Sequence, residues 1–556
     1  MDTRHSLNTP VARAVALALA MSASSATWAQ NAPADTLEEV VVTGIRASLT
    51  SAVAVKRNAT GVVEAINAEE MGKFPEQNLA EALARIPGVS IDRFNEEGSK
   101  ITVRGMGPEF NLVTLNGRSM PTAGGRSFDF NDIATEGISA VEVFKTAKAY
   151  LPTGGIGATV DIRTARPLDE AGFHGAFSAK GVHENSASKS SIRKLHELTP
   201  EISGIVSDTF ADDKFGVLLS GAYQKRDNRE ENAAVDNWCP SYQCTGGNNN
   251  PFVAGTVENN NKRADGVYWH PQNIGYGWAD ITRTRTNGQA VLQWAPTDRV
   301  TATLDYTYSK LELLKDANSV GIWFAGPNVD AVINERGTVT QVTQNGGSPG
   351  DWSTNIARDH TIKENNSVGF NVTFKATDNL ALNLDAHSSS SKFGGAGIGG
   401  EPASSENLII GNTSCPWCAG AGPGFGPNTA TIDQKTGTFS SSGVPIMNAT
   451  FIDGNGNPIG FPGQGDIGSL FGQAFNTKQK NGIDQIQLGG KWKNAEQSPV
   501  KSVDFGYGYT KQTFDQQNAY SNNLPAGYWL TSAQYWQNGV LQKGSLYHGH
   551  SGDATA

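Results

Sequence analysis

Alternation of apolar and polar residues is the strongest pattern in the second part of the chain. Apolar side chains occupy every second position from Val300 to Tyr308, and Thr, Asp and Ser residues fill the positions between them. The same period of two recurs in three further stretches, residues 368–375, 380–387 and 503–510. Successive side chains of a strand point to opposite faces, so each stretch is predicted to be a strand of about ten residues with one apolar face. Such strands are typical of transmembrane β-barrels, although a soluble sandwich alternates in the same way.

The connections between these strands fall into two lengths. Tight turns are predicted at residues 211–214, 296–298 and 376–379. Long polar segments are predicted to be loops near residues 227–287, 315–365 and 392–481. Short turns at one end and long loops at the other are typical of outer-membrane barrels.

Roughly nine or ten strands fit before Phe514, whereas large outer-membrane barrels have up to about 22. An open edge would leave backbone groups unpaired in hydrocarbon. We therefore expect residues 168–556 to be a partial barrel with long extracellular loops, in a fragment or truncated product that does not transport by itself.

Residues 47–167 follow a different pattern, which predicts a compact α+β unit. A helix is expected at residues 78–86, with Leu79, Leu83 and Ile86 on one face and Pro87-Gly88 ending it. Asn116-Gly117 predicts a two-residue hairpin turn. Short strands are expected at residues 89–92, 100–104, 112–115, 118–120, 138–144 and 157–164.

The N-terminus is typical of an exported protein. Residues 1–29 combine early arginines, an apolar run and a small-residue end, which predicts a cleaved signal peptide. The next distinctive segment is residues 37–46 (LEEVVVTGIR), in which two carboxylates precede three valines. It favours an extended conformation and has no neighbouring strand with which to form a hairpin, so it is suited to adding a strand to a partner's sheet. The alternative is the first strand of a soluble β-domain.

Three series of residues resemble the plug domain of TonB-dependent outer-membrane receptors. They are residues 74–93 (FPEQNLAEALARIPGVSIDR), 101–118 (ITVRGMGPEFNLVTLNGR) and 138–167 (ISAVEVFKTAKAYLPTGGIGATVDIRTARP). The resemblance is strongest to the branch found in Caulobacter- and Xanthomonas-like bacteria, and residues 37–46 resemble the family's TonB box. It implies an α+β plug domain at residues 47–167 inside an antiparallel transmembrane β-barrel, after a periplasmic segment at residues 30–46.

The family also implies a function in the outer membrane, active uptake of a small nutrient. The residues expected to bind TonB are Leu37, Glu38, Glu39, Val40, Val41, Val42 and Thr43. The residues expected to contact the ligand, on plug tips and loops, are Phe94, Asn95, Glu96, Arg118, Thr122, Arg126, Trp238 and Trp269. For Arg118 we favour pairing with a carboxylate of the barrel wall. Loop indoles stack on sugars, anchor at the membrane interface or pack the loops, and the resemblance favours a carbohydrate over an iron siderophore.

The composition and the cysteines narrow the range of partners and of cysteine chemistry that we expect. A net charge of −10 and the lack of a basic stripe argue against a nucleic-acid partner. The cysteines form two close pairs, Cys239 with Cys244 and Cys415 with Cys418. Zinc binding and redox chemistry are open alternatives, but an oxidising compartment favours two local disulfides.

We expect no enzyme activity, cofactor or metal site, because the nine histidines are scattered and the sequence contains no HExxH motif. Two rival interpretations are kept. A passive porin or adhesin-type barrel would need neither residues 37–46 nor a plug, and a secreted β-rich enzyme would be soluble without detergent.

Overall fold

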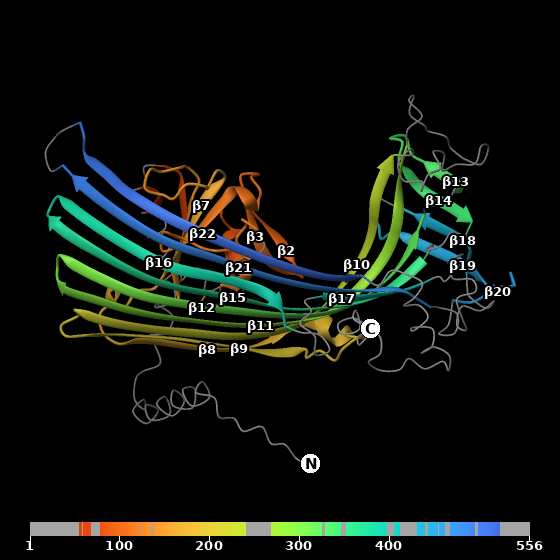
Figure 1. The fold of residues 1–556 in the computed structure, drawn as a ribbon, viewed down its shortest axis with the longest axis horizontal. Coiled ribbons are helices and arrows are strands. Elements are labelled where there is room, and N and C mark those ends of the chain that lie inside the picture. The colour runs from red at the N-terminus through yellow and green to blue at the C-terminus, as the bar shows by residue number, and fades with distance from the viewer. Residues whose placement is uncertain are drawn as a thin grey trace, which may run out of the picture.

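The computed structural model describes most of the chain after residue 54. The described residues are 55–57, 59, 61–67, 78–123, 125–133, 135, 137–240, 268–324, 328–345, 352–396, 405–411, 431–439, 443–453, 455–461, 468–494 and 499–522. The predicted signal peptide, TonB box and disulfides therefore lie outside the described side chains. Three parts are visible, a plug, a long curved sheet that we call the wall, and a small outer sheet (Figure 1).

The plug is a mixed α+β unit. Its strands are β1 (Val63–Asn67), β2 (Val89–Phe94), β3 (Glu97–Val103), β4 (Asn111–Leu115), β5 (Arg118–Ser119), β6 (Ile138–Phe144) and β7 (Ala158–Thr164). Five of them form a sheet in the order β1-β6-β7-β4-β5, in which β4 and β7 are parallel, and β2 pairs with β3. The predicted strands are confirmed, with ends that differ by a few residues.

The predicted helix is confirmed as α4 (Leu79–Leu83), which is shorter than expected. The Asn78 side chain caps it by accepting hydrogen bonds from the backbone N–H groups of Ala80 and Glu81. Leu79 and Leu83 pack into the buried plug core with Ile101, Val141 and Ile162. Short 3₁₀ turns complete this region and the start of the wall: η1 (Pro108–Phe110), η2 (Phe130–Asp132), η3 (Pro167–Asp169) and η4 (Asn185–Lys189).

The wall is a ten-stranded antiparallel sheet. Its strands are β8 (His174–His183), β9 (Leu198–Phe210), β10 (Phe215–Pro240), β11 (Trp269–Thr297), β12 (Val300–Trp323), β15 (Trp352–Thr377), β16 (Leu380–Gly395), β17 (Ser405–Gly411), β21 (Gly468–Lys493) and β22 (Ser502–Asn522). β17 continues the line of β16, because both pair with β15 and β21. Among the described residues no pairing joins β22 to β8, so the wall is an open sheet.

The three tight turns are confirmed at residues 211–214, 298–299 and 378–379. The predicted strand length is wrong: β10, β11, β12 and β15 have 26, 29, 24 and 26 residues. Large parts of the predicted loops therefore belong to strands. The alternation fades there because neither face needs to be apolar, whereas backbone pairing continues without it.

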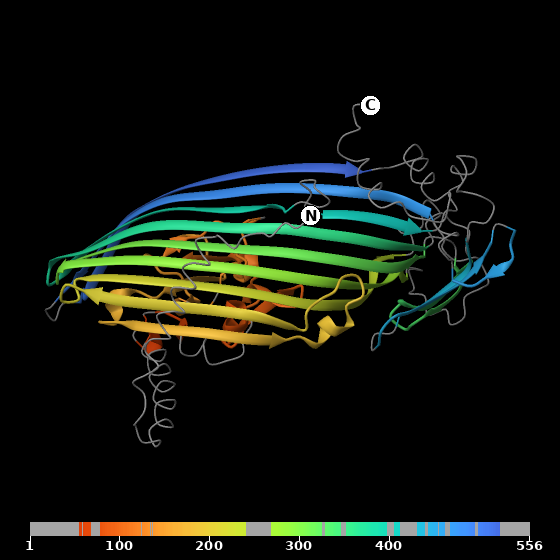
Figure 2. The same cartoon turned by 90° about the horizontal axis from the view of Figure 1, so that it is seen from below.

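The predicted two faces of the wall are confirmed. Exposed apolar side chains on one face form what we call the belt, near the tight turns: Phe177, Val206, Leu219, Leu292, Leu304, Phe370, Leu384, Ile486, Leu488, Phe505 and Tyr509. The plug lies against the other, polar face (Figure 2). Among the described residues, no helix is both long and apolar enough to cross a membrane.

The outer sheet corrects a second part of the loop prediction. Its strands are β13 (Asn328–Ile333), β14 (Val339–Asn345), β18 (Thr431–Thr438), β19 (Ile446–Ile452) and β20 (Pro458–Ile459), paired in that order. They cover a core that includes Phe324, Ile333 and Ile432, and Ile274 and Ile322 of the wall contribute to it. These strands are short and come from distant segments of the chain. No local alternation of apolar and polar residues therefore predicts them.

Replacing Phe324 by Ala is expected to loosen the outer sheet alone. Phe324 is 1% exposed and stacks edge-on against Phe439 at 5.8 Å between ring centroids. Truncation should cost about 3–5 kcal/mol, as for other buried phenylalanines. Hydrogen exchange should then rise in β14 and β18 but not in the plug.

Phe370→Ala is the matched control, because that ring is an exposed part of the belt. Equal exchange in the two variants would contradict a separate core under the outer sheet.

Candidate functional site

The first contact between plug and wall is a buried arginine. Arg118 follows the Asn116-Gly117 turn, whose residues have φ angles of 55° and 80°, as a tight hairpin turn requires. Its guanidinium donates to Asp305 of β12 at 2.7 and 2.8 Å and to Asp385 of β16 at 2.8 and 2.9 Å. All three side chains are less than 10% exposed. Arg118 therefore pairs with carboxylates of the wall, which is the role that we favoured for it from the sequence.

A glycine makes room for this contact. Gly369 of β15 lies between Asp305 and the β16 strand in the register of the sheet. A Cβ atom at Gly369 would stand 1.8 Å from a guanidinium nitrogen of Arg118. Burial lowers the pKa of Arg118, but the two carboxylates outweigh this effect and raise it, so the group stays charged.

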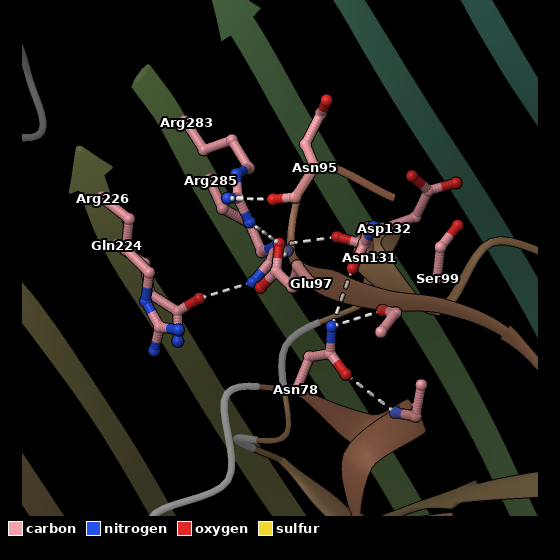
Figure 3. A network of polar contacts seen from close by, with 12 residues as sticks. Asn78, Asn95, Glu97, Ser99, Asn131, Asp132, Gln224, Arg226, Arg283 and Arg285 are labelled. Carbon is pink, nitrogen blue, oxygen red and sulfur yellow. Dashed lines mark hydrogen bonds and ion pairs between the residues drawn. The ribbon is translucent and has the colours of Figure 1, made fainter. Parts of the chain in front are cut away.

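A second contact joins the β2–β3 hairpin to β11 (Figure 3). Glu97 is 1% exposed and accepts from Arg283 at 2.6 Å and from Arg285 at 3.1 Å. Arg283 also donates to the Asn95 carbonyl at 2.7 Å, and Arg285 donates to the Asn131 carbonyl at 2.7 Å. Burial raises the pKa of Glu97, but the two arginines outweigh it and lower the pKa to about 2.

This contact also connects the parts of the plug. The Asn78 side chain donates to the Gly98 carbonyl at 2.6 Å and to the Asn131 side chain at 2.7 Å, as Figure 3 shows. The residue that caps α4 therefore holds the β3 strand and the η2 turn together. Both of those elements carry groups that bind the wall.

The third contact is a lysine between two carboxylates. Lys363 of β15 lies 2.8 Å from Asp129, which caps the start of η2, and 3.0 Å from Asp132, the last residue of η2. The Asp132 carbonyl accepts from Asn287 of β11 at 3.1 Å. Burial raises the pKa of Asp132 to about 6 despite the nearby lysine.

The tip of the β2–β3 hairpin lies beside a polar hollow of the wall. Asn95 and Glu96 both adopt the left-handed conformation, with φ angles of 51° and 70°. Lys315 donates to the Asn95 side chain at 3.0 Å and to Glu230 at 3.0 Å, and Asn228 donates to Glu96 at 3.0 Å. Glu230 and Lys315 also line a hollow of about 140 Å³ with Asn232, Ser319 and Asn355.

The eight residues predicted to contact ligand do not form one site. Phe94, Asn95 and Glu96 lie together at the plug tip, where Phe94 is 59% exposed. Thr122 accepts from Asn481 of β21 through its carbonyl, and Arg126 is bound to the Gly154 carbonyl.

Trp238 and Trp269 lie at the far ends of β10 and β11, on adjacent strands. They are about ten residues, or about 33 Å of strand, beyond the Asn228 position that meets the plug tip. Their neighbour is the outer sheet, since Trp238 stacks edge-on against Phe439.

Arg283, Arg285, Glu230 and Lys315 were missed, because they fall in segments predicted to be loops. A signal for the two arginines was present. Arg283 and Arg285 lie an even number of residues before Gln289 and Gln293. All four side chains therefore lie on the same face of β11. Among the described residues, no group of three or more His, Cys, Asp or Glu side chains is placed to hold a metal ion.

Known proteins resemble the plug region most clearly. The family described as "TonB-dependent Receptor Plug Domain" matches residues 55–159. The chain is 30% identical over 149 residues to the ferric enterobactin receptor PirA of Pseudomonas aeruginosa, an alignment that covers 24% of this chain and 20% of that protein. It is 29% identical over 111 residues to the vitamin B12 transporter BtuB of Photobacterium profundum, covering 20% of this chain and 18% of that protein. The chain thus aligns with only about a fifth of the length of these relatives.

Solved structures that align with this chain include the siderophore receptor PirA from Acinetobacter baumannii. Its TM-score is 0.32 at 13% identity, covering 85% of this chain and 79% of that one. A mutant of the ferric enterobactin receptor PfeA of Pseudomonas aeruginosa, in complex with enterobactin, gives a TM-score of 0.32 at 11% identity and covers 82% of this chain and 72% of that one.

Replacing Arg118 by Leu is expected to loosen the plug from the wall. The variant would leave Asp305 and Asp385 buried without their cation, which should cost about 3–5 kcal/mol. Hydrogen exchange of β4, β5 and β7 measures the loss. Adding Asp305→Asn and Asp385→Asn to the variant should restore part of the protection.

Arg163→Leu is the matched control, because that side chain is 51% exposed and its carboxylate partners, Glu142 and Asp161, belong to the plug and not to the wall. It should cost no more than about 1 kcal/mol. Hydrogen exchange in Arg118→Leu that equals the exchange in Arg163→Leu would contradict a role of Arg118 in docking the plug.

Plug docking is expected to weaken in acid through Glu97. The folded pKa of about 2 lies below the ordinary value of 4.5. The charge therefore stabilises the docked plug above pH 4.5, and this contribution, roughly 3 kcal/mol, is lost as the pH falls toward 2. The difference in β3 exchange between wild type and Glu97→Gln should be largest at pH 7 and shrink below pH 4.5.

Glu109→Gln serves as control for this pH series, because Glu109 is exposed on η1. A difference between wild type and Glu97→Gln that stays constant from pH 7 to pH 2 would contradict the assignment.

Proposed function

We propose that this chain, whose residues 55–159 match the plug-domain family of the TonB-dependent receptors, acts as an energy-coupled outer-membrane receptor for a small nutrient. The observation that carries this proposal is the plug itself, docked by three buried ionic contacts on the polar face of a two-faced wall. The belt on the other face suits contact with hydrocarbon. Residues 37–46 precede the plug, where TonB in the periplasm would bind them by strand addition.

The docking contacts support a gating role for the plug. Each contact buries charge that is compensated only while plug and wall stay together, so separation has a defined cost. Force applied at residues 37–46 would act on β1, which forms an edge of the plug sheet. A passive porin or adhesin needs no such domain, and the relatives are named as receptors and a transporter rather than enzymes.

We propose that the ligand binds at the hollow beside the plug tip. Asn95 and Glu96 of the plug and Glu230, Asn232 and Lys315 of the wall supply donors and acceptors there. The relatives are named for ferric enterobactin and vitamin B12, so the preference for a carbohydrate finds no support among them. The ligand class is therefore kept at a small nutrient with several hydrogen-bonding groups.

In a full-length version of the protein, Val41→Pro is expected to abolish active uptake and leave ligand binding unchanged. Proline removes a backbone N–H and prevents strand addition by residues 37–46. Uptake and binding are measured in cells that express the protein from its own gene, with ferric enterobactin, vitamin B12 and a xylo-oligosaccharide as labelled probes.

Ala34→Pro is the matched control, because it lies upstream of the TonB box in the same segment. Uptake of a bound probe at the wild-type rate by Val41→Pro would refute energy coupling through this segment.

A further inference from the structure

The connection between β8 and β9, residues 184–197, folds back onto the wall, and we call it the strap. The Ser186 hydroxyl accepts from the backbone N–H of Arg229 on β10 at 3.0 Å. The backbone N–H groups of residues 191–193 all donate to the Asp280 side chain of β11, at 3.2, 2.8 and 2.9 Å. The Arg193 side chain donates to Asp316 of β12 at 2.9 Å. The strap therefore crosses three neighbouring strands.

The strap lies on the face of the wall opposite to the hollow beside the plug tip. Glu230 and Lys315 line that hollow. Side chains alternate between the two faces of a strand, so Arg229 points away from Glu230, and Asp316 points away from Lys315. An even number of residues, paired without irregularity, separates Asp316 from Leu304 of the belt. The strap thus covers the belt face of the wall, beyond the belt itself.

Beneath the strap, four charged residues stand opposite one another on neighbouring strands, and we call them the charge rung: Arg229, Asp280, Asp316 and Arg358. Their strands, β10, β11, β12 and β15, run side by side (Figure 1). The two aspartates in the middle are 0% and 3% exposed. Like charges directly opposite each other destabilise a sheet. The arginines at the ends lie 3.4 Å from Asp280 and 2.5 Å from Asp316, and the strap supplies the remaining donors.

Arg193 holds β11 and β12 together as well as compensating their charge. Besides Asp316, its guanidinium binds the Thr282 hydroxyl of β11 at 2.7 Å and the Asp280 carbonyl at 3.3 Å. The planar guanidinium fixes the direction of each donor, whereas a lysine would supply only a point charge. The relative position of the two strands is therefore set by one side chain of the strap.

The hollow beside the plug tip depends on the same strands. Glu230 of β10 and Lys315 of β12 meet at 3.0 Å across β11, where Ala279 lies opposite Glu230 in the register. Neighbouring strands lie about 4.8 Å apart, so β10 and β12 are about 10 Å apart. This contact therefore depends on how the three strands bend relative to one another. The strap spans the same strands on the other face, where it fixes that bend.

We propose that the strap positions the hollow beside the plug tip from the opposite face of the wall, with Arg193 as the positioning residue. By holding the charge rung, it sets the bend of β10, β11 and β12 and thereby the spacing of the donors and acceptors that meet the nutrient. Arg193 does not touch the ligand and acts through the backbones of β11 and β12. The inference rests on the proposed function, in which the nutrient binds at this hollow.

Pulsed electron paramagnetic resonance on a full-length version of the protein tests the geometry without a ligand. Spin labels at Asn232→Cys and Asn355→Cys, both on the hollow, report the separation of β10 and β15 after the native cysteines have been blocked. One narrow distance distribution is expected with the native strap, and Arg193→Gln should broaden it. The control Lys194→Gln changes the exposed neighbour of Arg193 and should leave the distribution narrow.

Uptake kinetics in cells separate positioning from folding. The probe is whichever of ferric enterobactin, vitamin B12 and a xylo-oligosaccharide the wild type binds. Arg193→Gln should raise its half-saturation concentration at least about fivefold, the scale of coupling between distant groups. The maximal rate should stay at the wild-type level, because the plug and residues 37–46 are unchanged. Arg193→Lys keeps the charge but not the fork of donors, so it should recover only part of the affinity.

A double variant distinguishes positioning from simple charge compensation. Arg193→Gln combined with Asp316→Asn removes the surplus carboxylate together with its partner. Hydrogen exchange in the strap should then return toward the wild-type level, because no buried charge is left without a cation. The affinity should stay low, since nothing replaces the donors of Arg193 to β11.

The proposal is overturned if Arg193→Gln leaves the distance distribution narrow, or if it lowers the maximal rate at an unchanged half-saturation concentration. Full recovery of affinity in the double variant would also overturn it, because Arg193 would then act only as a counter-charge. The distance measurement needs no nutrient, so failure of the proposed function is seen independently of it.

Discussion

Buried charge governs how the plug and the wall fit together. A desolvated arginine or carboxylate is stable only beside its partner, and the plug presents such groups at Arg118, Glu97 and Asp132. Their partners lie on β11, β12, β15 and β16. A plug shifted by one residue along the wall would lose these pairs together, because alternate wall positions face the opposite side. Position and orientation are thus fixed by a few contacts rather than by a large apolar interface.

The same requirement explains the composition of the wall. Its plug-facing side carries Asp, Asn, Gln and Arg, and its other side carries the belt near the tight turns. Gly369 shows how closely the two parts are matched, since any side chain at that position would displace the guanidinium of Arg118. Beyond the belt, both faces become polar and the strands continue by backbone pairing. This extension carries the hollow beside the plug tip and supports the outer sheet.

The proposed gating role requires contacts between plug and wall that are strong but reversible. The ionic pairs hold the plug at neutral pH, and the strained turn at Asn95 and Glu96 brings its tip to the polar hollow. Strain of this kind is maintained where the surrounding structure holds it, often at binding sites. The proposed ligand contact and the docking of the plug would meet at this tip, because Glu97 follows Glu96 directly.

Sequence periodicity determined the local elements. The two-faced strands, the tight turns, the helix before Pro87-Gly88 and the Asn116-Gly117 hairpin each follow from neighbouring residues, and the structure has all of them. The partners of Arg118 were beyond sequence reasoning, because Asp305 and Asp385 are 187 and 267 residues away. The strand extensions and the outer sheet also depended on tertiary structure. A local period reports which face is buried, but long-range pairing decides where a strand ends and which buried charges meet.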